Sequence, residues 1–235
     1  DLTGDIAGLA SSIYMRGIDF YNIPTSMLAM VDSSIGGKTA INFEGIKNVV
    51  GTFYQPKKVL IDINLLETLD KRLLNEGLAE SLKMAITSNK ELFNLVENED
   101  IYSNLQTIII ESLKIKKDVV IKDEKELGLR KVLNFGHTIA HGIEVNSDLY
   151  HGECVALGMI CMINDELKDR LIKILNKLDL KTSIDINVDD VIDVIKHDKK
   201  ANKDKISTVV VDKIGEFRFV DMDIDEIKER LKIIL

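Results

Sequence analysis

Three of the chain's four histidines lie in a single stretch, which reads LNFGHTIAHGIEVNSDLYHGE. His137 and His141 are four residues apart, so on a helix their side chains share one face. The glutamate of the HExxH zinc-protease motif is absent, because Thr138 stands in its place. His151 follows a loop-like NSD segment and precedes a second long apolar segment, which would let it fold back toward the first pair.

Three neutral imidazoles and one carboxylate would suit zinc or cobalt. Spacing alone leaves the binding pair undecided between His137–His141 and His137–His151. The alternative without a metal is a polar helix patch that contains one hydrogen-bonded histidine.

A candidate carboxylate lies in the segment NEGLAESLKMA, where Glu80 is flanked by apolar residues. Lys83 follows three residues later and shares its helix face. On this pattern alone a solvated ion pair, worth a few tenths of a kcal/mol, is favoured over a role in a site.

The segment VDSSIGGKTAINFEGIKN resembles the end of a phosphate-binding loop, because two glycines precede Lys38. A Walker A motif needs an earlier glycine, which is missing, so we exclude a P-loop nucleotide triphosphatase. The segment also carries Asp32, Lys47 and Asn48, a set that suits an anion and sugar hydroxyls. A surface loop without a ligand is the alternative.

Cationic and amide side chains gather around the histidines. Lys116 and Arg130 bracket the run DVVIKDEKELGL, and Asn134 shares a helix face with His137. Lys199 and Lys200 follow the fourth histidine in the run HDKKANKDK. Together these residues predict a cationic, metal-bearing pocket for a phosphorylated, acidic, polyhydroxylated substrate, although a solvated basic run would also explain the lysines.

The elements that must position these side chains fall into two parts. About sixty residues of mixed strand and helix come first, with a short strand and a turn at 20–26, a polar loop at 33–42 and a strand at 57–63. A mostly helical body follows, and strands at 205–211 and 217–220 form a hairpin within it. Helical periodicity marks residues 1–17, 70–96, 101–122, 131–146, 152–177 and 223–235.

Composition narrows the classes of function. A net charge of −8 argues against a protein that coats nucleic acid, and no apolar run is long enough for a membrane span. Cys154 and Cys161 are seven residues apart, too far on a helix for a disulfide. Two free thiols indicate a reducing, cytoplasmic setting.

Six motifs occur in an order that resembles the 3-dehydroquinate synthases, members of the sugar-phosphate cyclase family, along nearly the whole chain. The resemblance implies that residues 1–63 are the end of a Rossmann-like NAD-binding α/β domain, most of which would precede Asp1. It implies that residues 64–235 form a mainly helical metal- and substrate-binding domain. The motifs are IPTSMLAMVDSSIGGKTAIN, YQPKKVLID, GLAESLK, LGLRKVLNFGHTIAHGIE, HGECVALGM and DKKANK.

The resemblance also implies an activity. Such enzymes use NAD and one divalent metal, zinc or cobalt, and act as cytoplasmic homodimers. They convert 3-deoxy-D-arabino-heptulosonate 7-phosphate to 3-dehydroquinate in the shikimate pathway, which leads to the aromatic amino acids. Transient oxidation by NAD, phosphate elimination, re-reduction and an intramolecular aldol reaction make up the conversion.

Carried over motif by motif, the resemblance assigns residues to four roles. The metal ligands would be Glu80, His137 and His151. The NAD contacts would be Asp5, Thr25, Ser26, Asp32 and Lys47. The substrate contacts would be Arg16 in a neighbouring subunit, Asp32, Lys38, Asn48, Lys83, Lys116, Arg130, Asn134, His141 and one of Lys199 or Lys200, which would hold the phosphate. The catalytic set among these would be Lys38, Lys83, Arg130, Asn134 and His141.

Departures from the family pattern leave every reacting group in place. Ala140 and Gly142 exchange the usual small residues, Ser26 replaces threonine, and Leu9 replaces a common aromatic residue. The close rival is a sister cyclase that makes a valiolone or an inosose, and Asn134 and His141 weigh against the valiolone makers. The more distant rivals are a polyol dehydrogenase and a non-catalytic, truncated fragment.

Overall fold

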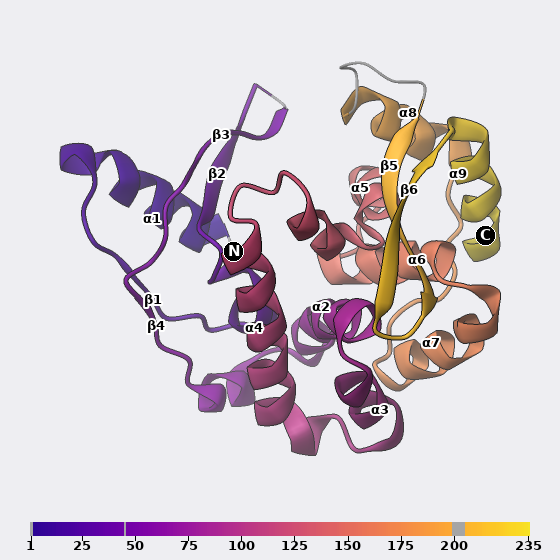
Figure 1. Ribbon diagram of the computed structural model, residues 1–235, viewed down its shortest axis with the longest axis horizontal. Coiled ribbons are helices and arrows are strands. Elements are labelled where there is room, and N and C mark those ends of the chain that lie inside the picture. The colour runs from indigo at the N-terminus through magenta and orange to yellow at the C-terminus, as the bar shows by residue number, and fades with distance from the viewer. Residues whose placement is uncertain (1, 45, 199–204) are drawn as a thin grey trace.

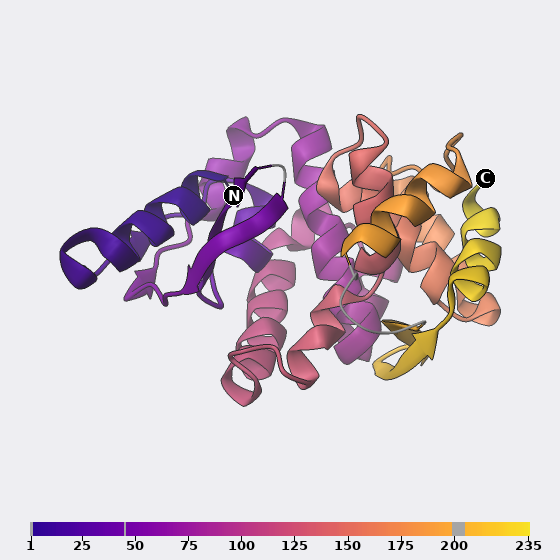
Figure 2. The ribbon, with the colours of Figure 1, turned by 90° about the horizontal axis from the view of Figure 1, so that it is seen from above.

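The computed structural model of the protein describes residues 2–44, 46–198 and 205–235, and the side chains of residues 46, 47 and 198 are not described. Its N-terminal part and its helical body lie on opposite sides of the long helix α4 (Figures 1 and 2). The predicted class, an α/β segment followed by a mainly helical body, is confirmed.

The N-terminal part contains one α-helix and two small sheets within the described residues. The periodicity of residues 1–17 predicts a helix, and helix α1 (Leu2–Ile13) is followed by a 3-10 turn, Tyr14–Arg16. Strands β1 (Tyr21–Asn22) and β4 (Lys58–Val59) pair in parallel, and both are shorter than the sequence indicates. A π-helix, Ala29–Ser33, carries Asp32.

The prediction of a loop at 33–42 is wrong over its second half. Residues 38–43 form strand β2 (Lys38–Phe43), which pairs antiparallel with β3 (Ile46–Phe53). Thr39 is buried in this hairpin and its hydroxyl lies 3.1 Å from that of Thr52, so cross-strand contacts outweigh the polar, glycine-containing local sequence. Only the turn through Gly36 and Gly37, both with positive φ, remains a loop.

The body is built from helices α2 to α9 and one hairpin. Strands β5 (Ile206–Lys213) and β6 (Glu216–Met222) form the antiparallel hairpin that the sequence predicts. Helix α8 (Val188–Asp198) lies in a segment for which the sequence indicates no element. The other helices are α2 (Lys71–Ser88), α3 (Lys90–Asn98), α4 (Leu105–Lys122), α5 (His137–Val145), α6 (His151–Met162), α7 (Asp165–Lys177) and α9 (Ile224–Leu231).

Three of the predicted helices are interrupted, and each break has a local cause. Asn89 separates α2 from α3, and its side chain accepts a hydrogen bond from Leu92 N at 2.9 Å. Asn164 caps α7 in the same way and so ends α6. The segment 131–146 begins as a 3-10 helix, Leu129–Asn134, and changes direction at Gly136, whose φ is 79°.

Helix α6 is the centre of the body. Every residue of it except His151 is buried, and it packs against α2, α5, α7, α9 and β5. A helix that is apolar around its whole circumference is expected to be enclosed in this way. Among the described residues, no helix combines the length and the apolarity that a bilayer span requires.

Candidate functional site

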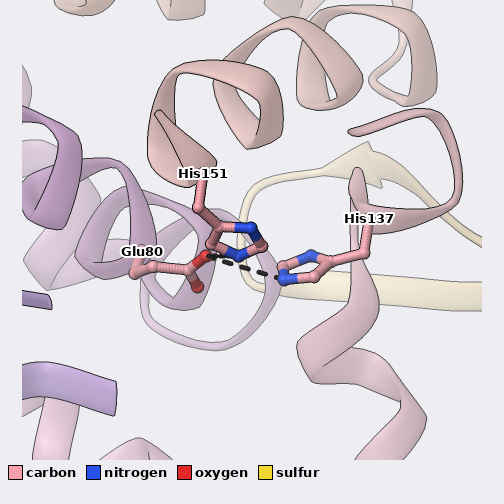
Figure 3. Close-up of side chains that lie close together, drawn as sticks. All are labelled: Glu80, His137 and His151. Carbon is pink, nitrogen blue, oxygen red and sulfur yellow. Dashed lines mark ion pairs between the residues drawn. The ribbon is translucent and has the colours of Figure 1, made fainter. Parts of the chain in front are cut away.

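Glu80, His137 and His151 meet in the body, and one donor atom from each lies within 4.8 Å of the others (Figure 3). His137 Nε2 is 3.6 Å and His151 Nε2 is 3.4 Å from Glu80 Oε1. This cluster, here called the metal centre, joins three side chains that are far apart in the sequence.

Close helix packing brings these side chains together. Glu80 lies in the middle of α2, while His137 and His151 are the first residues of α5 and α6. A Cβ at Gly152 would lie 2.0 Å from the backbone oxygen of Glu76, and one at Gly158 would lie 2.0 Å from that of Gly136. Glycine at these two positions therefore lets α6 approach both α2 and the start of α5.

The donor set fits a divalent cation of the zinc type. The Glu80 side chain is only 1% exposed, and neither of its oxygens accepts a hydrogen bond of good geometry. Lys83, 2% exposed, forms an ion pair with it. The pair is buried, unlike the solvated pair that the sequence pattern favours. Two imidazoles and one carboxylate leave a position open for a substrate oxygen, as catalytic zinc sites do.

The protonation states of the two rings differ. Burial, followed by the ammonium group of Lys83, lowers the pKa of His137 to about 3, so this ring is neutral. Burial also opposes the charge on His151, but the neighbouring carboxylates of Glu144 and Glu80 outweigh it and raise its pKa to about 10. A metal ion would therefore have to displace a proton from His151.

A second contact orients each ring. His137 Nδ1 lies 3.2 Å from the carbonyl oxygen of Phe135, and His151 Nδ1 lies 3.3 Å from Glu144 Oε2. These contacts leave both Nε2 atoms directed toward Glu80. The His141 ring lies 6.1 Å from that of His137, centre to centre, and is not part of the cluster.

A cavity of about 490 Å³, here called the cationic pocket, lies between the β2–β3 hairpin and α4. Lys116 Nζ lies 2.8 Å from Asp32 Oδ1 there. Burial opposes the charge on Asp32, but Lys116 and then Lys83 hold its pKa below the ordinary value. Five predicted substrate contacts line the cavity: Asp32, Lys38, Asn48, Lys116 and Arg130.

Backbone carbonyls fix the guanidinium of Arg130 at the pocket wall. Its Nη1 donates to Glu124 O at 2.6 Å and its Nη2 donates to Gly36 O at 2.9 Å. The carboxylate of Asp123 accepts bonds from the backbone N–H groups of Leu127, Gly128 and Arg130. The Asp123 side chain therefore stabilises the turn that precedes Arg130 and so sets the position of Arg130.

Sequence reasoning missed Glu126. Its carboxylate forms an ion pair with Lys38 and accepts a hydrogen bond from Asn134 Nδ2 at 2.7 Å. Burial raises the pKa of Glu126, but Lys38 and Asn134 outweigh it and the pKa lies below the ordinary value. The residue stands in the charged run DEKE, which gives no local signal that one carboxylate turns inward.

A second cavity, of about 440 Å³, adjoins the first and shares Asp5, Ser33, Lys38 and Thr39 with it. The predicted NAD contacts Asp5, Thr25 and Ser26 line this second cavity. Burial raises the pKa of Asp5.

Four predicted contacts remain. Arg16 lies in the turn after α1, at the end of that helix which points away from the body (Figures 1 and 2). Lys199 and Lys200 lie outside the described residues, and so does the side chain of Lys47.

Comparison with known proteins gives a consistent result. The family model described as 3-dehydroquinate synthase N-terminal matches residues 2–76, and the model described as 3-dehydroquinate synthase C-terminal matches residues 77–201. A 3-dehydroquinate synthase of Picrophilus torridus is 43% identical, over 95% of this chain and 70% of its own length. One of Streptococcus thermophilus is 41% identical, over 98% and 70%.

Solved structures agree with this result. A 2-epi-5-epi-valiolone synthase from Streptomyces hygroscopicus, with NAD+ and Zn2+ bound, superposes with a TM-score of 0.88 at 28% identity, over 98% of this chain and 70% of its own. A 2-deoxy-scyllo-inosose synthase, complexed with carbaglucose-6-phosphate, NAD+ and Co2+, gives 0.88 at 25%, over 99% and 72%. A probable glycerol dehydrogenase from Sinorhizobium meliloti shares the fold at 14% identity, with a TM-score of 0.59 over 99% of this chain and 73% of its own.

Proposed function

The chain belongs to the 3-dehydroquinate synthase family, and from this premise we propose that it cyclises 3-deoxy-D-arabino-heptulosonate 7-phosphate with release of phosphate. The product would be 3-dehydroquinate. The observation that carries this proposal is a Glu–His–His cluster with a buried carboxylate, whose Glu80 and neighbouring Lys83 both act on the pKa of Asp32 in the cationic pocket.

The metal centre is proposed to hold one zinc or cobalt ion through Glu80, His137 and His151. When bound, the ion would supply Lewis-acid stabilisation of a developing negative charge on a substrate oxygen. Lys83 keeps Glu80 ionised, since it holds the pKa of that carboxyl well below the ordinary value against the effect of burial.

The cationic pocket is proposed to bind and orient the anionic substrate. Lys38 and Arg130 supply charge, Lys116 keeps Asp32 ionised, and Asn48 offers an amide to hydroxyl groups. Such preorganised electrostatics are the largest contribution in many enzymes, because the charges need no rearrangement during the reaction.

Asn134 and His141 are proposed to contact the substrate on the side of the metal centre. Asn134 is held by Glu126, and the His141 ring lies edge-on to that of His137. Glu126 holds Lys38 through an ion pair and Asn134 through a hydrogen bond, so we add it to the proposed site as a positioning residue.

NAD is proposed to bind at the second cavity. When bound, it would accept a hydride and later return it. The proposed contacts are Asp5, Thr25, Ser26 and Asp32. Their carboxylates would accept hydrogen bonds from ribose hydroxyls, and their hydroxyl groups would donate to phosphate oxygens. Lys47 for NAD, and Lys199 or Lys200 for the substrate phosphate, are proposed from the family pattern alone.

A homodimer in the cytoplasm, with Arg16 reaching the neighbouring subunit's substrate, is part of the same proposal, as is a division into domains at 1–63 and 64–235. Cys154 and Cys161 are both buried and form no disulfide with each other, which suits a reducing compartment. Sedimentation velocity of the chain would test the dimer, and a monomer at all concentrations would refute it.

A sister cyclase is the second candidate, because two of the solved structures with the same fold are a valiolone synthase and an inosose synthase. Identity to the 3-dehydroquinate synthases is higher, at 41–43% against 25–28%. Phosphate release from a sugar phosphate that has no carboxylate, but not from the heptulosonate phosphate, would favour this candidate.

The deciding experiment is a phosphate-release assay with the heptulosonate phosphate, NAD and either Zn2+ or Co2+. We expect turnover that a chelator abolishes and that added metal restores. Undiminished turnover after complete metal removal would refute the metal's role. A folded protein that binds neither metal nor NAD would support the reading as a non-catalytic scaffold.

A further inference from the structure

One face of α2 contacts the first turn of α6 at three successive levels. Arg72, Glu76 and Glu80 are spaced by four, so they form a single stripe along the helix. On α6, Arg72 contacts Glu153 and Glu76 contacts Gly152. Glu80 contacts His151. The last of these three contacts is one side of the metal centre.

The outermost contact is a bidentate ion pair between Arg72 and Glu153. Arg72 Nε and Nη2 donate to the two oxygens of Glu153 at 2.8 and 2.7 Å, and the guanidinium stacks 4.2 Å from the centre of the Tyr150 ring. Glu153 also accepts a hydrogen bond from Tyr150 N at 2.7 Å. The residue just before His151 is thus held on both its ring and its backbone.

The middle contact acts on the backbone of α6. Glu76, which is buried, accepts a hydrogen bond from Gly152 N at 2.9 Å. This N–H belongs to the first turn of α6 and has no partner within its own helix. Because a Cβ at Gly152 would overlap the Glu76 carbonyl, the two helices touch directly at this level.

We propose that Arg72 and Glu76 are positioning residues for the metal centre. They hold the residues on either side of His151 against α2, so the His151 ring reaches Glu80 on the next turn of the same stripe. Neither residue touches the metal ion. This proposal rests on the metal centre put forward above.

The proposal is tested by Co2+ titration of the protein, followed through the visible absorption bands of the bound ion. Arg72→Ala and Glu76→Ala are expected to weaken Co2+ binding by about 10- to 100-fold, the usual cost of losing a group that orients a metal ligand. The absorption bands should shift as well, since the His151 ring would sit differently at the ion.

Two variants serve as controls. Glu76→Gln keeps an oxygen that can accept the Gly152 N–H and should bind Co2+ as the wild type does. Arg170→Ala breaks a similar bidentate ion pair elsewhere in the body. There Arg170 donates to both oxygens of Glu97 at 2.6 and 2.5 Å and lies 4.8 Å from the centre of the Phe93 ring. It should lower thermal stability as Arg72→Ala does, yet leave Co2+ affinity unchanged.

Unchanged affinity in either Arg72→Ala or Glu76→Ala would overturn the proposal, and so would an equal loss in Arg170→Ala. If Glu76→Ala does not fold, the comparison of Arg72→Ala with Arg170→Ala decides. A wild type that binds no Co2+ would refute the metal centre and this proposal together, whereas binding that the variants leave intact would refute this proposal alone.

Discussion

The metal centre and the cationic pocket are held in place by different means. All three side chains of the metal centre stand on helices that pack against one another, and Glu80 is almost completely enclosed. In the pocket, Lys38 comes from a strand and is 49% exposed, Asp32 comes from a π-helix, and Arg130 is fixed by backbone carbonyls.

The difference matches what each region would bind. A metal ion requires ligand distances correct to about 0.2 Å, which rigid packed helices can guarantee. A substrate with several charged and hydroxyl groups is bound by many contacts, so each one tolerates more movement. Contacts between packed helices define the first region, whereas a strand, a π-helix and a hydrogen-bonded turn define the second, and mutations should separate the two.

The largest effect is expected from a substitution that disrupts the metal centre alone. His151→Ala should weaken Zn2+ or Co2+ binding by more than about 100-fold, beyond the usual cost of losing an orienting group. His141→Ala should retain the ion, because its ring lies outside the cluster. Metal content after dialysis, measured by mass spectrometry, checks both, and equal metal content in the two variants would contradict the ligand assignment.

The next largest effect is expected from a substitution that disrupts the cationic pocket alone. Glu126→Gln should lower turnover by up to about 100-fold, because Lys38 and Asn134 lose the carboxylate that holds both. Its Co2+ affinity should not change. Glu124→Gln, which alters a neighbouring carboxylate bonded to Gln55, is the control and should keep full turnover. A loss of Co2+ binding in Glu126→Gln would mean that the two regions are not separable.

The smallest effect concerns stability within the pocket. Lys116→Met should lower the free energy of unfolding at pH 7 by about 2 kcal/mol, because Asp32 loses its cationic partner. Lys114→Met, which breaks an exposed pair with Glu111 on the same helix, should cost a few tenths of a kcal/mol, or about 0.5 at most.

The acid dependence of stability should change in the same variant. The depressed pKa of Asp32 contributes stability above its unfolded value of about 3.9, and this contribution is lost as the pH falls through the folded pKa. Lys116→Met lacks the contribution and should lose less stability on acidification. Urea unfolding at pH 7 and pH 3 measures the difference, and parallel losses in both proteins would contradict it.

The sequence predicted the class of fold and indicated that the histidine-containing stretch could bind a metal ion, because helical periodicity and rare residue types are local signals. It could not choose between His141 and His151 from spacing. That choice depends on how closely α6 approaches α2, which is set by Gly152 meeting the backbone of a distant helix. Only the resemblance to a family selected His151.

Two other features were hidden for the same reason. The β2–β3 hairpin depends on pairing between Thr39 and Thr52, which no short window of sequence displays. Glu126 stands among other charged residues, and only its partners Lys38 and Asn134 distinguish it from a solvated side chain. Contacts between distant segments decide both.

The position of His151 and His137 at the very starts of α6 and α5 has a consequence for folding order. The His151 ring can face Glu80 only after α6 has docked on α2, and the His137 ring only after α5 has packed against α6. An unfolded or half-assembled chain therefore offers no preformed site. A metal ion would thus bind only the finished body and shift the folding equilibrium toward it by mass action. Metal binding would then be a late step in folding, and it would indicate that assembly of the body is complete.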